Sequence, residues 1–201
     1  MTEQLFEQNL AALERDGFLL IPQVLSQEVI EQWKEILYGM YHRGEYEISN
    51  GVGNVAFEKL LALQPTLTQE LVGHPAAAPY LQSVMGRQCQ LRSLRAHVNP
   101  SDYTQEWHKD FYDYYYQVEK SEAGEPAKAV CMNTTFYLTD NTPDRARLTF
   151  VKDYMHKPVP DELVPHLGYT EDRTDPFQVW CDNAELAHLH PMAGDMVIFY
   201  S

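Results

Sequence analysis

The stretch "LRSLRAHVN", residues 91–99, marks a change in the periodicity of the sequence. Leu94, Ala96 and Val98 alternate with polar residues, which is the pattern of a half-buried β-strand. Arg95 would then lie on the opposite face, with the other polar side chains of the stretch. The chain therefore divides shortly before this stretch into two parts with different patterns.

The part before residue 88 has the periodicity of helices. "LFEQNLAALERDG" (5–17) places its leucines on one face and stops at Gly17, a residue that favours a helix C-terminus. Ser26 is a suitable N-cap for a second helix, and "FLLIP" (18–22) between the two predicts a short strand. Further short helices separated by prolines are expected to follow.

The part from residue 88 onward predicts short strands separated by turns. Beyond the opening stretch, the expected strands are "AVCMNTTFYLTD" (129–140), "RLTFV" (147–151), "FQVWC" (177–181), "ELAHLH" (185–190) and "MVIFYS" (196–201). Helices followed by many short strands favour an α+β fold with an antiparallel sandwich or barrel. We predict one domain over residues 1–201, with 1–87 as mainly helical support and 88–201 as the strand core.

Composition narrows the classes of function. The 201-residue chain carries a formal net charge of -14, which argues against nucleic acid or an anionic membrane as a partner. Its 3 cysteines are far apart and form no CxxC pair, so neither a disulfide framework nor a thiolate zinc site is expected. No apolar run approaches membrane-spanning length. We expect a cytoplasmic protein.

The segment "QEWHKD" (105–110) carries the candidate chemistry. If it is a strand, His108 and Asp110 point to the same side, because side chains two residues apart share a face. An imidazole and a carboxylate suit Fe(II), which is often held by two histidines and one carboxylate with open positions opposite. From the residues alone, a surface pair in a turn or a hydrogen-bonded structural pair stays open.

The order of several motifs extends the interpretation. "ALERDGFLLIPQVLSQEVIEQWK", "QEWHKD", "MNTTFYLTD", "LTFVKDYMHK" and "AGDMVIFYS" follow one another along nearly the whole chain. In this order they resemble the phytanoyl-CoA dioxygenase family of Fe(II)- and 2-oxoglutarate-dependent oxygenases. The resemblance implies a double-stranded β-helix, or jelly roll, with N-terminal helices packed on one sheet. It also implies that His108 and Asp110 are the first two iron ligands, with dioxygen and 2-oxoglutarate as cosubstrates.

The family pattern continues past the last residue of this sequence. It has a further ligand histidine after the strand matched by "AGDMVIF", then an arginine for the far carboxylate of 2-oxoglutarate. We expect both residues, and the last strands, to follow Ser201, because "MVIFY" would otherwise form an exposed apolar edge. Two alternatives stay open: His188 or His190 could replace the histidine, or the protein could lack iron.

Other residues are assigned to the same site. Arg95, Asn133 and Thr135 are expected to face the barrel interior and to contact 2-oxoglutarate, with a solvated sheet face as the alternative. An aromatic group is expected to exclude water and contact the substrate, although some of its members could be ordinary core residues. Its members are Trp107, Phe111, Tyr112 and Tyr115.

The resemblance predicts an enzyme that hydroxylates, desaturates or cyclises a small organic substrate, such as a specialised metabolite. The carboxylate of Asp110 favours these outcomes over halogenation, because related halogenases have a small residue in its place. A non-catalytic jelly-roll binding protein is the main alternative. A cupin-type metal enzyme that uses dioxygen without 2-oxoglutarate is a second.

Overall fold

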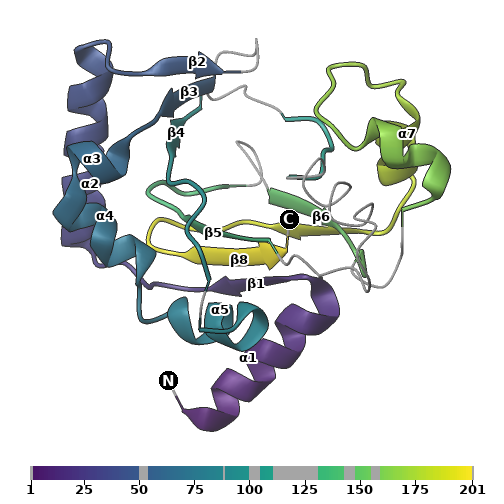
Figure 1. The fold of residues 1–201 in the computed structure, drawn as a ribbon, viewed down its shortest axis with the longest axis horizontal. Coiled ribbons are helices and arrows are strands. Elements are labelled where there is room, and N and C mark those ends of the chain that lie inside the picture. Colours follow the sequence, from purple (N-terminus) through teal and green to yellow (C-terminus); the bar gives the residue numbers. More distant parts are fainter. Residues whose placement is uncertain are drawn as a thin grey trace, which may run out of the picture.

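The computed structural model describes residues 2–49, 54–87, 89–99, 105–110, 131–142, 148–154 and 159–200. The described residues form three small antiparallel sheets with helices on the outside (Figure 1). The predicted α+β class is therefore confirmed. No helix within these ranges combines the length and the apolarity needed to cross a bilayer.

The N-terminal elements follow the sequence signals. Helix α1 (Glu3–Asp16) ends at Gly17, whose φ of 81° is a left-handed conformation that glycine adopts without strain. Strand β1 (Phe18–Ile21) follows directly. Helix α2 (Gln27–His42) begins after Ser26, whose hydroxyl accepts a hydrogen bond from the backbone N–H of Val29.

The first sheet has the order β1-β8-β5, with β8 (Met196–Tyr200) between β1 and β5 (Met132–Phe136). Helices α1 and α5 (Ala78–Met85) cover its lower face in Figure 1. The buried residues that join these helices to the sheet are Leu13, Leu19, Ala77, Tyr80, Met196 and Ile198. The expectation that "MVIFY" would be an exposed edge is wrong, because β8 is the central strand and pairs with β1 on one side and with β5 on the other.

The second sheet has the order β2-β3-β4 and packs beside helix α2, on the side of the helix that faces the middle of the molecule (Figure 1). Its strands are β2 (Glu47–Ser49), β3 (Asn54–Phe57) and β4 (Ala96–Val98). Two short helices, α3 (Leu60–Leu63) and α4 (Pro65–Val72), connect β3 to the rest of the N-terminal region. The sequence patterns did not indicate β2 and β3, because each is only three or four residues long.

The apolar side of "LRSLRAHVN" packs as predicted. Leu94, Ala96 and Val98 contact the core cluster built by Trp33, Leu37, Met40, Phe57 and Leu60. Only residues 96–98 form strand β4, where Ala96 pairs with Phe57 and Val98 with Val55. The polar side of the stretch therefore points away from helix α2.

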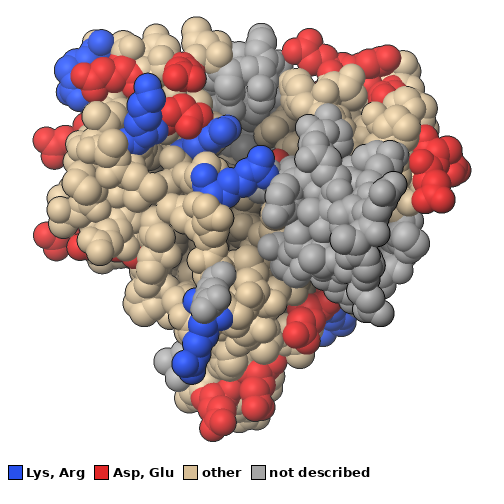
Figure 2. Space-filling model, viewed as in Figure 1, with Lys and Arg blue, Asp and Glu red and all other residues tan. Residues whose placement is uncertain are grey.

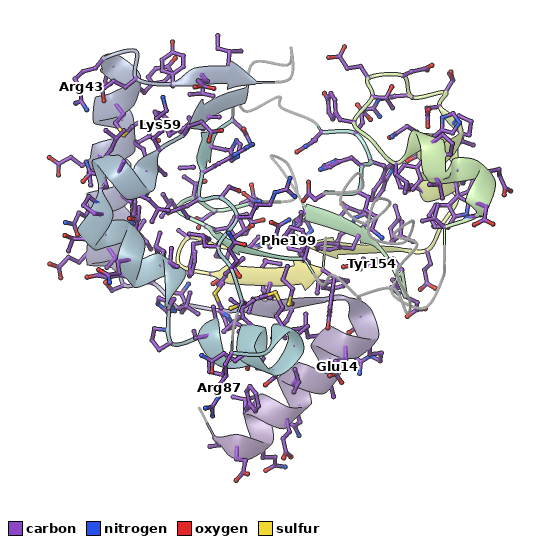
Figure 3. The ribbon with its side chains drawn as sticks, in the orientation of Figure 1. Glu14, Arg43, Lys59, Arg87, Tyr154 and Phe199 are labelled. Carbon is purple, nitrogen blue, oxygen red and sulfur yellow. The ribbon has the colours of Figure 1, made fainter. Side chains whose placement is uncertain are left out.

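The third sheet consists of β6 (Leu148–Val151) and β7 (Leu186–Leu189). Phe150 of β6 joins it to the first sheet, since its ring centroid lies 4.5 Å from that of Phe18 and 5.3 Å from that of Phe199. The side chain of Tyr154, labelled in Figure 3, donates its hydroxyl proton to the backbone carbonyl oxygen of either Gly17 or Tyr200, each 2.8 Å away. The upper face of the first sheet is thus covered at this end by a second layer.

The segment "FQVWC" is a helix and not the predicted strand. Helix α7 (Pro176–Asp182) begins after Asp175, whose carboxylate accepts a hydrogen bond from the N–H of Phe177. Proline is well suited to the first helical position because it lacks an N–H. Phe177 and Cys181, four residues apart, are buried together on one face, whereas a strand would put them on one side with Val179, which is exposed. A 3-10 helix, η1 (Asp161–His166), lies against α7.

Candidate functional site

Residues 105–110 have no regular secondary structure, contrary to the prediction of a strand. The segment is held instead by contacts with the chain around η1 and α7. The backbone N–H of Lys109 donates to the carbonyl oxygen of Leu167 at 2.9 Å. The Glu106 carboxylate accepts a hydrogen bond from Arg173 at 2.7 Å. Polar contacts with residues distant in sequence therefore fix this backbone, as hydrogen bonds between strands would fix it in a sheet.

Trp107 is anchored to α7 by its backbone and by its side chain. The side-chain amide of Gln178 accepts from the Trp107 N–H at 2.8 Å and donates to the Trp107 carbonyl oxygen at 2.5 Å. The indole N–H of Trp107 donates to the Asp182 carboxylate at 2.7 Å. The indole also packs against the buried cluster under α7. Trp107 thus has a clear structural role, and its predicted contact with a substrate stays a prediction.

His108 and Asp110 point toward one another, with His108 Nε2 3.3 Å from Asp110 Oδ1. His108 Nδ1 lies 2.8 Å from the carbonyl oxygen of Glu106. A carbonyl oxygen only accepts, so Nδ1 must carry a hydrogen and donate it. In the neutral imidazole the lone pair is then on Nε2, facing the carboxylate. The side-chain amide nitrogen of Gln105 also lies 3.3 Å from Nε2. The two acceptors, Nε2 and the carboxylate, favour a cation or a proton between them, as expected for a metal-binding pair.

Asp110 is held by a residue of the first sheet. Asn133 in β5 donates from its amide nitrogen to Asp110 Oδ2 at 2.7 Å. This leaves Oδ1 as the oxygen that faces His108. Asn133 was predicted to contact 2-oxoglutarate, and the structure gives it a contact with the predicted metal ligand. Thr135, two residues further along β5, lies on the same side of the sheet as Asn133.

The pair shifts the pKa of both partners. Burial alone would lower the pKa of His108, but the hydrogen bonds to Asp110 and to Glu106 outweigh burial, and the pKa is raised. Burial alone would raise the pKa of Asp110, but His108, Asn133 and the charge of Arg95 together lower it. At neutral pH the carboxylate is therefore ionised and attracts positive charge.

Arg95 acts on this pair through its charge. Its guanidinium is near enough to lower the pKa of Asp110, and its Nε lies 3.0 Å from the Glu58 carboxylate. Figure 2 shows Lys and Arg side chains interspersed with acidic ones over the part of the molecule formed by α2 and β2–β4, and acidic side chains along the outer edge of the part that contains α7. Arg95 is thus an exposed cation close to the pair, and its predicted contact with 2-oxoglutarate stays a prediction.

Several predicted residues cannot be located in the site. Phe111, Tyr112 and Tyr115 lie outside the described residues. One aromatic contact to the pair does occur: the ring of Tyr169 lies edge-on to that of His108, with 6.4 Å between the ring centroids. Sequence reasoning missed Tyr169, which is distant in sequence and belongs to no pattern that would single it out.

The described residues supply two ligands of a possible metal site. Within them, no group of three His, Cys, Asp or Glu side chains is arranged to hold a metal ion. The suggestion that His188 or His190 completes the set therefore finds no support: His188 Nδ1 lies 3.1 Å from the Thr149 hydroxyl, on the sheet formed by β6 and β7. Each of the two ligand side chains fits a metal ion, but the pair alone is an incomplete site.

Solved structures match the chain closely in fold. The epimerase SnoN, in complex with Fe3+, alpha ketoglutarate and nogalamycin RO, matches with a TM-score of 0.70 at 19% identity, over 99% of this chain and 75% of that one. HygX from Streptomyces hygroscopicus, with nickel, 2-oxoglutarate and hygromycin B bound, matches with a TM-score of 0.71 at 16% identity, over 99% and 78%. EctD from S. alaskensis with bound Fe matches with a TM-score of 0.67 at 14% identity, over 100% and 68%.

These matches concern the fold, because the sequence identities are low. No protein-family model and no curated protein sequence matches the chain. The likeness to iron- and 2-oxoglutarate-dependent enzymes that the sequence motifs predicted is thus confirmed at the level of the fold. The completed double-stranded β-helix and the single-domain boundaries stay predictions.

Proposed function

We propose that this chain is the oxygenase domain, over residues 1–201, of a non-haem Fe(II)- and 2-oxoglutarate-dependent enzyme. Its substrate would be a small organic molecule, such as a specialised metabolite, that is hydroxylated, desaturated or cyclised. The observation that carries the proposal is the 3.3 Å approach of His108 Nε2 to Asp110 Oδ1, with His108 Nδ1 occupied by a backbone carbonyl. The fold of the matched enzymes supports it.

In this proposal each described residue has a defined task. His108 and Asp110 supply two iron ligands, and Asn133 keeps the Asp110 carboxylate turned toward His108. Arg95 and Thr135 contact the cosubstrate, for which a guanidinium is a suitable carboxylate partner. Iron and 2-oxoglutarate would together supply the activation of dioxygen for attack on a C–H bond. The third ligand and the second arginine stay predictions from the family order.

The aromatic residues near the pair are proposed to form the substrate wall. Trp107, Phe111, Tyr112 and Tyr115 would exclude water and offer flat apolar surfaces. Trp107 fits this task only in part, because its indole N–H is bonded to Asp182 and its ring packs under α7. One edge or face of the ring would have to remain open to the substrate.

The proposal is tested by adding Fe(II) and 2-oxoglutarate to the purified chain without oxygen and recording the visible absorption spectrum. A weak metal-to-ligand charge-transfer band that saturates with 2-oxoglutarate is expected. The band should disappear in His108→Ala and persist in His42→Ala, which changes an exposed histidine at the end of α2. Since the described residues provide two ligands, added imidazole should strengthen the band by supplying a further nitrogen.

A non-catalytic binding protein is the second candidate. It is favoured by the absence of a third His, Cys, Asp or Glu next to the pair among the described residues. Such a protein would give no band with or without imidazole, and it would keep its ligand after treatment with a chelator. Oxygen uptake that is independent of 2-oxoglutarate would instead favour a cupin-type enzyme.

A further inference from the structure

Gln178 is a buried polar residue, and the oxygen and the nitrogen of its side-chain amide both bond to a single residue, Trp107. Its side chain is 1% exposed, and both ends of its amide contact the backbone of Trp107, 71 positions earlier in the sequence. Burying an amide is costly unless its donors and acceptors are paired. The amide oxygen accepts from the N–H of Trp107 and the amide nitrogen donates to its C=O, so the side chain satisfies both backbone groups of one residue, as the backbone of a paired strand does.

The geometry of the peptide unit connects this contact to His108. The Trp107 N–H and the Glu106 carbonyl belong to one planar trans peptide, so they point in opposite directions. Gln178 accepts from the N–H, and the carbonyl on the other side accepts from His108 Nδ1 at 2.8 Å. Fixing one end of the peptide therefore fixes the other. The second contact, from Gln178 to the Trp107 carbonyl, holds the next peptide, which leads into His108.

We infer that Gln178 is a positioning residue for the proposed metal pair: it orients the Glu106–Trp107 peptide, which in turn holds His108 in the tautomer with Nδ1–H and an unprotonated Nε2 that faces Asp110. The part that concerns metal affinity rests on the proposed function. The part that concerns the His108 tautomer does not. Gln178 itself touches no reacting group in this arrangement.

The side chain has to be an amide for this task. A carboxylate keeps the acceptor for the Trp107 N–H but loses the donor for the Trp107 carbonyl, and a thioether has no donor and only a weak acceptor. The pair Gln178→Met and Gln178→Glu therefore separates the two contacts. Gln82→Met, on the exposed side of α5, is a matched control for the loss of an amide far from the site.

The first measurement is the nitrogen NMR spectrum of the metal-free chain labelled at histidine, with His108 assigned from His108→Ala. At a pH well above the pKa of His108, where the ring is neutral, the wild type and Gln82→Met should show Nδ1–H and an unprotonated Nε2. Gln178→Met should show a mixture of tautomers, because the Glu106 carbonyl is no longer held toward the ring. Gln178→Glu should stay closer to the wild type, because it keeps the bond to the Trp107 N–H.

The second measurement is calorimetric titration with Ni(II) alone. Loss of an outer contact that orients a ligand costs about 10- to 100-fold in metal affinity, and we expect this loss in Gln178→Met and a smaller one in Gln178→Glu. Wild-type tautomer and wild-type affinity in both Gln178 variants would overturn the inference. If the wild type binds no Ni(II) even when imidazole is added to supply the further ligand, the proposed metal function fails, and the tautomers of the same variants still decide whether Gln178 positions His108. If Gln178→Met does not fold, Gln178→Glu decides: a smaller but measurable loss of Ni(II) affinity supports the inference, and an unchanged tautomer with unchanged affinity overturns it.

Discussion

The first sheet and the segment 105–110 are built by different forces. In the sheet, Met196, Val197 and Ile198 are completely buried between paired strands and helices. In the segment no residue is fully buried, and its conformation depends on polar contacts with residues such as Gln178 and Asp182. Burial makes the sheet stable, whereas the polar contacts fix the direction of particular side chains.

This difference predicts that substitutions in the two regions have separable effects, on stability and on metal binding. A change in the buried core of the sheet should reduce the free energy of unfolding and affect the site only through loss of folded protein, whereas Asn133 of β5 contacts the site directly. A change in a partly buried side chain of the segment itself, such as His108, should alter metal binding and change the free energy of unfolding only slightly.

The largest effect on stability is expected for Ile198→Ala. Ile198 is 0% exposed in the central strand, and removing its side chain leaves a cavity in the core of the first sheet. We expect a loss of about 2–5 kcal/mol in the free energy of unfolding, measured by urea denaturation followed by circular dichroism. Val179→Ala, at a position 46% exposed on α7, should change it by less than about 0.5 kcal/mol. Equal losses in the two variants would contradict the assignment of the core.

The next largest effect is expected for His108→Ala, on metal binding alone. It removes a ligand nitrogen, so affinity for Ni(II) should fall by about 100-fold or more, which corresponds to about 2.7 kcal/mol. Because the His108 side chain is only partly buried, the free energy of unfolding should change by less than about 1 kcal/mol. Calorimetry and urea denaturation on one preparation check both values. A variant that loses stability but keeps its Ni(II) affinity would show that the pair is structural.

The sequence was informative where structure follows from local patterns. Helix α1 ends at Gly17 and α2 begins after Ser26, as predicted, because caps depend on neighbouring residues. The faces of β4 and β5 were predicted correctly, because alternation reports burial on one side of a sheet. "FQVWC" was misread because a five-residue apolar run fits a buried strand or a helix face equally well.

The site was only partly predictable for a different reason. The convergence of His108 and Asp110 was predicted, but from a strand that does not form. The contacts that bring the two side chains together span 71 residues to Gln178 and 23 residues to Asn133. A single sequence gives no signal for which distant amide meets which backbone, so these partners became visible only in the structure.

A smaller effect is expected for Asn133→Ala, which tests whether β5 orients Asp110. The change removes the donor to Asp110 Oδ2, and we expect Ni(II) affinity to fall by about 10-fold, within the usual range for an outer contact. Asn9→Ala is the matched control, because it also removes an amide donor, to the hydroxyl of Tyr80 in the core. The control should lower stability without changing Ni(II) affinity. If Asn133→Ala binds Ni(II) as tightly as the control Asn9→Ala does, Asn133 does not orient Asp110 for metal binding.

The smallest effect concerns pH and the start of helix α7. Asp175 Oδ2 lies 2.7 Å from His166 Nδ1, and Asp175 Oδ1 accepts from the Phe177 N–H at 2.9 Å. Burial alone would raise the pKa of Asp175, but these hydrogen bonds outweigh it and the pKa lies below its ordinary value. The folded state therefore holds the proton more weakly than the unfolded state does. The stabilisation is present above the ordinary pKa of about 4 and is lost as the pH falls through the lower, folded value.

Asp175→Asn isolates this contribution, because asparagine can still cap the helix but does not titrate in this range. Between pH 6 and pH 3, the melting temperature of the variant should fall by roughly 1–2 °C less than that of the wild type. Thermal melts at both pH values measure the difference.

Since α7 carries Gln178 and Asp182, weakening its first turn should weaken the contacts of these residues with Trp107 before the first sheet unfolds. Tryptophan fluorescence should then change at a higher pH than the circular dichroism of the sheet, and coincident transitions would mean that the two regions unfold as one unit.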